Sequence, residues 1–414
     1  MSIEIIDYDH DRDFDAVKQI WLDVGWFNED NVEDNEKGLE VMLQHAKTVV
    51  CPIDGVAECS VMSLPGFMRY LNQELQLGVI AAVTTGHVAR RMGAARKLTA
   101  DSLATLAEDG AEIAALGMFD QGFYNQVGFG SSSYMSMFHF DPNSLTVTNR
   151  FRPPKRLARD NWRDMHTAMK NRKRSHGGCW ITPPETMQSE AIWTPSAFGL
   201  GYYDGPDNTL SHFFWGEKEG QHGPYQITYL AYQSTDQLFE LLALIKSLGD
   251  QIHKVQLEAP PEIQLQDLLD QPFRIQRMTE GSEHENYHEA AAHMQARILD
   301  LPACMAKTEL PGETLSFNLA LTDPVTDHLL KPRRWQGVAG DYVVTLGPQS
   351  AAVVGKQAGL PVLQASVGAF TRMWLGVRNA SSLTLTDDLQ GSTELLQDLD
   401  RVVRVPSPHF GWDF

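Results

Sequence analysis

A run of small and basic residues, Arg90-Arg91-Met92-Gly93-Ala94-Ala95, directly follows an apolar stretch at positions 77–85. The apolar stretch is rich in β-branched residues, which is typical of a buried strand, and the residues after Ala95 repeat with helical spacing. A helix that begins just after a strand presents unpaired backbone N–H groups and the positive end of its dipole. Because small residues and two arginines surround these groups, we expect this turn to bind a phosphate or a diphosphate.

The elements that position this turn are predicted by the same segment. Residues 77–85 are expected as a strand, 86–89 as a turn, and a helix then opens at Arg90 and ends near Gly110, since glycine commonly stops a helix. Apolar residues on one side of this helix are Leu98, Leu103, Leu106 and Ala107. The turn alone is a weak pattern, and it matches neither the Gly-Lys-Ser/Thr nucleotide loop nor the three-glycine dinucleotide fingerprint.

A second segment, GFYNQVGFG at residues 122–130, follows the next predicted strand at 112–118. With Arg90-x-x-Gly93-x-Ala95, it resembles the Gcn5-related N-acetyltransferases (GNAT), and more specifically the enhanced intracellular survival (Eis) acetyltransferases. The resemblance implies that acetyl-coenzyme A is the co-substrate, and we expect no metal. It also implies that backbone groups bind the pantetheine arm at Val83, Thr84 and Thr85, and the diphosphate at Arg91, Met92, Gly93, Ala94 and Ala95, beside Arg90.

Acetyl transfer needs an acid for the leaving sulfur, and the resemblance assigns that role to Tyr124. A phenol keeps its proton at neutral pH because its ordinary pKa is about 10, so Tyr124 can donate one. The alternative is an aromatic ring that packs beneath the turn of residues 122–130, as Phe123 and Phe129 are expected to do. Both interpretations of Tyr124 stay open at the level of sequence.

The chain ends in Phe410-Gly411-Trp412-Asp413-Phe414, whereas exposed termini are usually polar. The resemblance implies that this end returns to the first domain, where the α-carboxylate of Phe414 acts as the base toward the substrate amine. Asp413 would attract an ammonium group. The alternative is a hydrophobic terminus that docks only for stability. Candidate walls of the acceptor pocket are Trp26, Phe67 and Ala81, and both Ala81 and Ala82 are small where the family often has bulkier residues.

Composition limits the classes of function. A net charge of −19 disfavours a general nucleic-acid binder and favours cationic or neutral small partners, whereas the alternative is that the charge serves solubility alone. The four cysteines form no C-x-x-C pair, which indicates reduced thiols and no zinc knuckle. The acidic first residues lack an apolar core, and no apolar stretch reaches the roughly eighteen residues of a membrane span. We therefore expect a cytoplasmic protein without a signal peptide or membrane contact.

A chain of 414 residues is expected to form two or three domains. The resemblance implies an α/β (α+β) architecture. A catalytic GNAT domain at 1–146 would precede a degenerate second GNAT-like domain at 147–285, and a sterol-carrier-protein-like domain would follow at 286–414. Residues 133–140 alternate and are expected to close the first sheet. The basic run at 150–174 is interpreted as a solvated helix face or an interface with the acidic remainder.

The sequence leaves two other functions open. A non-enzymatic protein could sense coenzyme A and bind a lipid in the carrier-like domain. The second is a zinc hydrolase, because residues 284–288, His-Glu-Asn-Tyr-His, match the H-E-x-x-H pattern that binds zinc when it lies on a helix. The alternative interpretation of this segment is a solvated connector between domains. The favoured function is transfer of acetyl to a primary amine of an aminoglycoside-like compound, a polyamine or lysine. The resemblance also implies a homo-oligomer, a hexamer in the Eis pattern.

Overall fold

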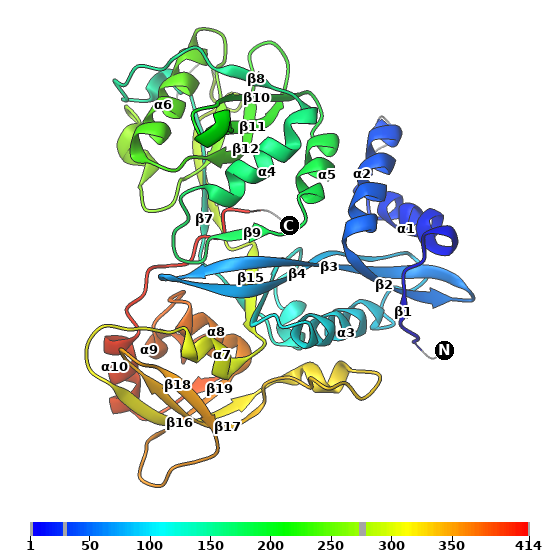
Figure 1. Ribbon diagram of the computed structural model, residues 1–414, viewed down its shortest axis with the longest axis vertical. Coiled ribbons are helices and arrows are strands. Elements are labelled where there is room, and N and C mark those ends of the chain that lie inside the picture. The colour runs from blue at the N-terminus through cyan, green and yellow to red at the C-terminus, as the bar shows by residue number, and fades with distance from the viewer. Residues whose placement is uncertain (1–2, 28–30, 273–278, 413–414) are drawn as a thin grey trace.

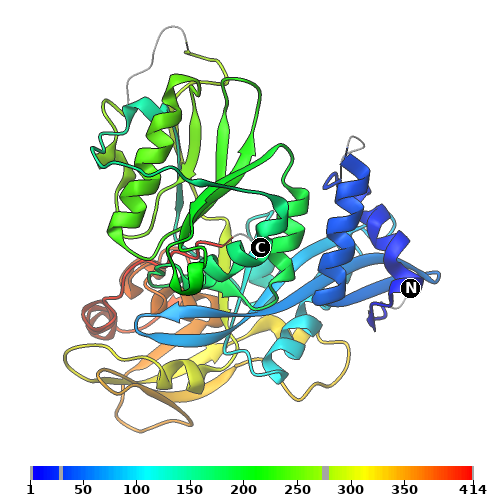
Figure 2. The same ribbon diagram turned by 45° about the horizontal axis from the view of Figure 1, so that its top comes forward.

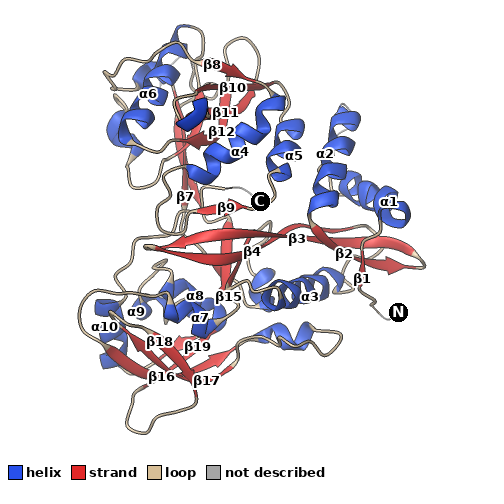
Figure 3. Cartoon of the chain, viewed as in Figure 1, coloured by secondary structure: helices blue, strands red, loops and turns tan. Residues whose placement is uncertain are grey.

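Three β-sheets organise the computed structural model, which describes residues 3–27, 31–272 and 279–412. Within these residues the sheets have eight, seven and five strands. In Figure 1 the eight-stranded sheet lies between the other two, and the turned view in Figure 2 keeps the same order. Helices pack beside each sheet (Figure 3), so the predicted mixed α/β architecture is confirmed.

The first sheet has the order β1-β2-β3-β4-β5-β15-β6, and β9 pairs with β3. Its strands are β1 (Ile6–Asp7), β2 (Lys47–Ile53), β3 (Val56–Tyr70), β4 (Gln73–Thr85), β5 (Ile113–Gly117), β6 (Gly130–Ser131), β9 (Cys179–Ile181) and β15 (Met294–Ile298).

Strand alternation gives this sheet two buried faces. Along β2, Cys51 packs with α3 (Ala94–Glu108), whereas Val50 packs with α1 (His10–Asp23) and α2 (Val32–His45). Successive strand residues point to opposite faces, so helices are needed on both sides. Figure 1 shows α1 and α2 on one face and α3 on the other. The helix after the predicted phosphate-binding turn is therefore held against the sheet by its apolar side.

Two strands cross between sheets in a way that the sequence does not predict. β7 (Met135–Phe140) was expected to close the first sheet, but it pairs with β13 (Val255–Glu258) and β14 (Tyr287–Ala291) of the second. That expectation is wrong because Phe138 and Phe140 enter the second core. In exchange, β15 pairs with β5 and β6 of the first sheet. The domain boundaries at residues 146 and 285 remain a proposal, because a strand close to each boundary pairs in the sheet of another domain. These strands are β7, before residue 146, and β15, after residue 285.

The second sheet has the order β14-β7-β13-β12-β11-β10-β8. Its other elements are β8 (Lys155–Leu157), α4 (Trp162–Asn171), α5 (Glu185–Trp193), β10 (Ala197–Tyr202), β11 (His212–Lys218), β12 (Tyr225–Ala231) and α6 (Thr235–Lys246). The unit β12–α6–β13 ends in a parallel strand pair, as β4–α3–β5 does in the first sheet. The second domain thus repeats the strand–helix–strand unit of the first.

The third sheet has the order β18-β17-β16-β19-β20. Its elements are α7 (Leu301–Ala306), β16 (Leu315–Thr322), β17 (Gly340–Leu346), β18 (Ala351–Val354), β19 (Val362–Ser366), α8 (Val367–Trp374), α9 (Ala380–Leu383), β20 (Leu389–Gln390) and α10 (Thr393–Val402). Helix α10 begins at Thr393, and the side chain of the preceding Ser392 caps it as predicted. In the described part of the chain, no helix combines the length and the apolar character that crossing a bilayer requires.

Candidate active site

Strand β4 separates from its neighbour β5 halfway along its length. β4 pairs with β3 along most of its residues, but with β5 only from Leu77 to Val79. Ala82 has a φ of +48°, and the pairing with β3 shifts there, which marks a β-bulge. Among the described residues, no strand pairs with the β5-facing edge of residues 80–85. An extended polar chain can therefore add to this edge as a strand would.

The loop after β4 forms a cradle in front of α3. Arg91 and Gly93 have positive φ angles of 62° and 80°, so the helix starts at Ala94 and not at Arg90 as expected. No side chain caps the first turn of α3, and a Cβ built at Gly93 would meet no atom of the described chain within 4 Å. Such backbone N–H groups at the positive end of a helix dipole favour an anion.

Two cavities meet beside this edge. The first, the α3 cavity, has a volume of about 710 Å³ and is lined by residues 83–85 of β4 and 89–97 of the loop and helix. The second, the aromatic cavity, has a volume of about 500 Å³ and lies between the first and second domains. Trp26, Val83 and Phe119 line both. A molecule bound along the first cavity can thus reach one bound in the second.

Tyr124 lies on the wall of the aromatic cavity. It opens a short 3₁₀ turn, residues Tyr124–Val127, and its side chain is only 2% exposed. The ring packs edge-to-face on Phe123 and Phe129, with centroids 4.9 Å and 6.2 Å away. Burial raises the pKa of the Tyr124 phenol above its ordinary value, and the nearby Cys59 adds to the effect. The hydroxyl therefore stays protonated at neutral pH.

A buried arginine from the neighbouring strand supports the Tyr124 turn. Arg297 of β15 donates a hydrogen bond to the carbonyl of Val127 and pairs with the carboxylate of Asp323 at 2.5 Å. Both charged side chains are fully buried. Asp323 follows β16, so this ion pair links the third sheet to the turn that carries Tyr124. A charge pair in such surroundings needs its partners, because neither group can find water.

The C-terminal residues run back between the domains toward this site. Residues 405–412, here called the terminal strap, are irregular in structure and end close to β9 (Figure 1). Cys179 of β9 donates its backbone N–H to the carbonyl of Phe410 at 2.8 Å. The guanidinium of Arg172 donates to the carbonyl of Gly411 at 2.7 Å, and the ring of Trp412 lines the aromatic cavity. The strap thus ends at the cavity that contains Tyr124.

The structure brings most of the predicted site residues together. Tyr124, Trp26 and Ala81 line the aromatic cavity, while Val83, Thr84, Thr85, Arg90, Arg91, Met92, Gly93, Ala94 and Ala95 line the α3 cavity. Phe67 lies apart from both: its ring stacks on Trp180 at 4.7 Å. Met62 and Leu64 of the same strand face the cavity, and alternation points an odd-numbered residue to the other face. Asp413 and Phe414 lie outside the described residues.

Several residues of this site were not singled out from the sequence. Trp21, Phe27, Phe119, Trp193 and Glu190 also line the aromatic cavity. The density of aromatic residues at positions 21–27 was a possible signal. The basic run at 150–174 offered another: its member Arg172 is partly buried and hydrogen-bonds the terminal strap. Trp193 lies in the second domain, so only the fold brings it here.

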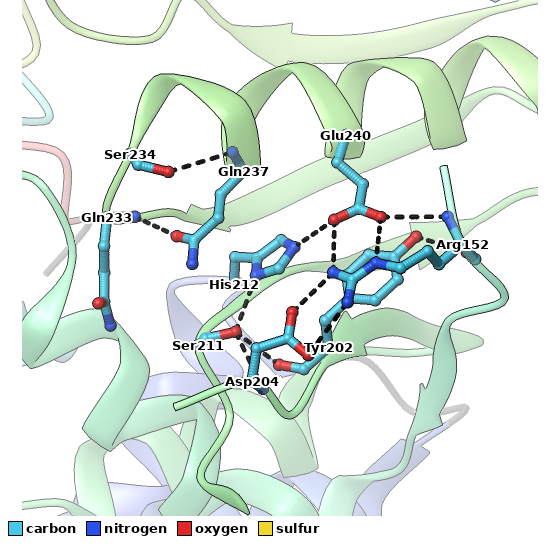
Figure 4. A network of polar contacts seen from close by, with 9 residues as sticks. All are labelled: Arg152, Tyr202, Asp204, Ser211, His212, Gln233, Ser234, Gln237 and Glu240. Atoms are coloured by element: carbon cyan, nitrogen blue, oxygen red, sulfur yellow. Dashed lines mark hydrogen bonds and ion pairs between the residues drawn. The ribbon is translucent and has the colours of Figure 1, made fainter. Parts of the chain in front are cut away.

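The H-E-x-x-H segment at 284–288 does not form the helix that a zinc hydrolase would need. His288 lies in strand β14, and His284 precedes that strand, so the two are not one helical turn apart. Another cluster, formed by Asp204, His212 and Glu240, has metal-ligating residue types. Figure 4 shows the Arg152 guanidinium between its carboxylates, at 2.6 Å from Asp204 and 2.7 Å from Glu240. Hydrogen bonding to Arg152 lowers the pKa of Glu240 to about 2. Arg152 thus supplies the positive charge that a metal would bring.

The second domain differs from the first at the matching turn. Helix α6 is capped by the side chain of Ser234, which accepts from the N–H of Gln237, and the Gln237 amide accepts from the N–H of Gln233 (Figure 4). Backbone N–H groups that could bind an anion at the start of α6 are thus already hydrogen-bonded to side chains of the chain itself. Beside β12 and β13, the ring of Trp412 packs against Tyr229 at 6.1 Å. The positions that are open to a ligand in the first domain are therefore occupied in the second domain by its own capping side chains and by the terminal strap.

Comparisons with known proteins agree with this geometry. Residues 6–132 match the acetyltransferase (GNAT) domain family, and residues 302–411 match the sterol carrier protein domain family. No curated protein matches the chain. These matches confirm the predicted acetyltransferase domain, the predicted carrier-like domain and the predicted enzyme class, an acyltransferase.

Solved structures share the whole fold. A probable N-acyltransferase from Enterococcus faecalis has a TM-score of 0.78 at 18% identity, with 100% of each chain covered. A GCN5-related N-acetyltransferase from Kribbella flavida has a TM-score of 0.75 at 16% identity, covering 100% of this chain and 98% of its own. Eis1 from Mycobacterium abscessus has a TM-score of 0.73 at 13% identity, with 100% of both chains covered. The resemblance in fold therefore spans all three domains.

Proposed function

We propose that this chain, whose residues 6–132 form a GNAT acetyltransferase domain, transfers acetyl from acetyl-coenzyme A directly to a primary amine. The observation that carries the proposal is the meeting of the two cavities at Val83, with Tyr124 on the adjoining wall. One cavity offers backbone groups suited to a diphosphate and an extended arm. The other has room for an acceptor beside an acid.

The α3 cavity fits the chemistry of coenzyme A. Its cradle combines the uncapped first turn of α3, the open space at Gly93 and the guanidinium groups of Arg90 and Arg91. The bulged edge of β4 at Val83 to Thr85 presents backbone groups that an amide-containing arm can pair with. Bound there, the thioester supplies an activated acetyl group.

Two groups of the chain donate and accept the protons that the reaction moves. The C–S bond of the thioester breaks as the N–C bond to the amine forms, and the Tyr124 hydroxyl protonates the departing sulfur. The α-carboxylate of Phe414 accepts the proton that the amine must lose. The strap geometry supports this second role, because its last described residue, Trp412, lines the same cavity as Tyr124. Asp413 adds negative charge toward the approaching ammonium group.

The acceptor is a primary amine, for which an aminoglycoside-like compound, a polyamine and a lysine side chain are the candidates that the family resemblance brings. The net charge of −19 favours a cation over an anion. Assembly as a homo-oligomer, a hexamer in the Eis pattern, is part of the same proposal and is measured by light scattering of the purified protein.

The test is release of free thiol from acetyl-coenzyme A in the presence of a panel of amines. The full chain is compared with a chain that lacks Asp413 and Phe414, and with Tyr124→Phe. Both changes are expected to lower kcat by about 100-fold or more, since each removes a general acid or base. Binding of coenzyme A, measured by calorimetry, should stay within about twofold of that of the full chain.

Two matched controls isolate the terminal carboxylate. Phe414→Ala keeps the carboxylate and removes the ring, whereas one glycine added after Phe414 keeps both side chains and moves the carboxylate by one residue. Activity should survive the first change better than the second. Full activity in the shortened chain would rule out the terminal base, and absence of thiol release with every amine would rule out the transferase.

A further inference from the structure

A cavity of about 640 Å³ lies where the terminal strap begins, and four segments far apart in the chain line it. The β3–β4 hairpin contributes residues 69–73, and the loop after α4 contributes 171–176. Residues from 307–311, after α7, and 404–406, after α10, complete the wall. In Figure 1 the strap, drawn in red, passes the tip of the hairpin. We call this space the basic cavity, because its described lining residues include six cations and two acids: Arg69, Arg172, Lys173, Arg174, Lys307 and Arg404 against Glu262 and Glu309.

Half of the cations are already neutralised by the chain. Three ion pairs do this: Lys173 with Glu262 at 2.8 Å, Arg174 with Glu74 at 3.0 Å, and Lys307 with Glu112 at 2.7 Å. The second lining acid, Glu309, is exposed and accepts a hydrogen bond from the Gln73 amide at 3.4 Å. These groups therefore leave little charge for a ligand to match.

The other three cations, Arg69, Arg172 and Arg404, have no ion pair with any carboxylate of the described residues. Only the Nε of the Arg69 guanidinium is bonded there, to the carbonyl of Leu71 at 2.8 Å. Arg172 donates to backbone carbonyls alone, and desolvation, aided by the charge of Arg174, lowers its pKa to about 10. Arg404 is exposed. Three unmatched guanidinium groups thus line one cavity of a chain whose net charge is −19.

Like charges gathered around a partly enclosed space repel one another, so the basic cavity favours an anion. A guanidinium presents a planar fork of N–H donors that matches the oxygens of a phosphate or a carboxylate. The three unmatched arginines belong to three different segments, and a tetrahedral phosphate can accept from several sides, whereas a single carboxylate has two oxygens in one plane. Among the described lining residues, the only ring is the imidazole of His176, whose two nitrogens already bond Leu71 and Leu375. A nucleotide base would therefore find no surface for stacking.

We propose that the basic cavity is a binding site for a small phosphate-type anion, held by Arg69, Arg172 and Arg404. The bound anion links the first domain, the second domain and the start of the terminal strap, since each of these arginines belongs to one of the three. It thereby fixes the strap, whose far end lies at the aromatic cavity. The inference does not rest on the proposed function, because these arginines line neither the α3 cavity nor the aromatic cavity.

The test is hydrogen–deuterium exchange followed by mass spectrometry, in the absence of coenzyme A. Sodium phosphate is compared with sodium chloride at equal ionic strength, because salt screens charges in either case. The reporter in the strap is the backbone N–H of His409, which donates to the carbonyl of His176 at 2.9 Å. Phosphate at about ten times its Kd should slow exchange in residues 402–411 by about 10-fold, because binding lowers the open population by that factor.

Matched arginine variants assign the effect to the cavity. Arg404→Met should abolish the slowing, and since Arg404 is exposed, the change leaves the core intact. Arg69→Met should abolish it from the first domain. Arg401→Met is the control, because Arg401 is an exposed arginine of α10 that pairs with Asp398 and lies outside the cavity. Slowing in this control, together with its loss in the other two variants, would support the site.

Other outcomes are equally decisive. Slowing confined to residues 88–97 would place phosphate only in front of α3, which would overturn this inference while supporting the cradle of the proposed function. Equal slowing in Arg404→Met and Arg401→Met, or no slowing at all, would also overturn it. Citrate that acts at a lower concentration than phosphate would overturn the phosphate class in favour of carboxylates. Glycerol 3-phosphate acting below the concentration of inorganic phosphate would support the site with an organic phosphate as its ligand, and the reverse order would support it with free phosphate.

Discussion

Replacing Arg172 by methionine should loosen the terminal strap without unfolding the rest of the chain. Arg172 follows α4 and is partly buried, and desolvation, aided by the charge of Arg174, lowers its pKa to about 10. It remains a cation at neutral pH. Its guanidinium donates to the carbonyls of Met169, Cys179 and Gly411 at 2.6 Å, 2.8 Å and 2.7 Å. Of these three, the bond to Gly411 joins the strap to the second domain, and a longer bond of 3.5 Å reaches the carbonyl of Phe410 in the same strap.

The expected size of the effect is estimated from the shorter of these two bonds, the one to Gly411. A hydrogen bond to a charged group contributes about 1.5–3 kcal/mol net, and about 1.4 kcal/mol corresponds to a factor of ten. Loss of the bond to Gly411 should therefore raise the undocked population of the strap by roughly 10- to 150-fold. Methionine keeps most of the volume of arginine, so the packing around Trp412 is largely preserved.

Carboxypeptidase digestion measures this population, because cleavage tracks the open form when opening is fast relative to cleavage. The signal is removal of Trp412, followed by mass spectrometry. Arg163→Met is the matched control, since Arg163 is an exposed arginine of α4 whose guanidinium lies over the ring of Trp162, away from the strap. Equal rates of Trp412 removal from the two variants would refute the assigned role of Arg172.

Two further predictions concern stability. Arg297→Leu should lower the free energy of unfolding by about 3–5 kcal/mol, because Asp323 would keep a buried charge without its partner. In urea denaturation, Arg297→Leu should cost less free energy of unfolding in a chain that already carries Asp323→Asn. If the losses of the two single variants simply add in the double variant, the coupling between Arg297 and Asp323 is contradicted. Burial lowers the pKa of His176 to about 4, while its ring nitrogens bond the N–H of Leu71 and the carbonyl of Leu375. The unfolded chain then binds a proton that the fold does not, so stability should fall by about 3 kcal/mol as the pH drops from 6.5 to 4. His176→Gln should flatten this part of the profile, and an unchanged slope would contradict the argument.

Local patterns predicted many elements of this chain correctly. The apolar run at 77–85 lies in strand β4, and the three leucines expected on one side of the following helix, Leu98, Leu103 and Leu106, are buried. Ser392 caps α10. Each of these features depends on residues a few positions apart, so periodicity and capping chemistry are sufficient to predict them.

Other features depend on partners far away in the chain. Alternation at residues 133–140 predicted a strand but assigned it to the first sheet, because alternation carries no information about which strand pairs with it. The start of α3 was placed four residues early, since the positive φ angles of Arg91 and Gly93 are not visible in a helical pattern. Phe67 was expected at the acceptor pocket, and the pleat of β3 turns it toward Trp180.

The sequence by itself determined the chemistry that this chain can offer: a strand, a small basic turn and a helix suited to a diphosphate, a tyrosine after the next strand, and an aromatic C-terminus. The tertiary structure alone decided which of these groups share a space. Trp193 of the second domain and Trp412 of the strap meet Tyr124 of the first at one cavity. The reason is physical: secondary structure follows from neighbours along the chain, whereas a cavity is formed by side chains that long-range packing brings together.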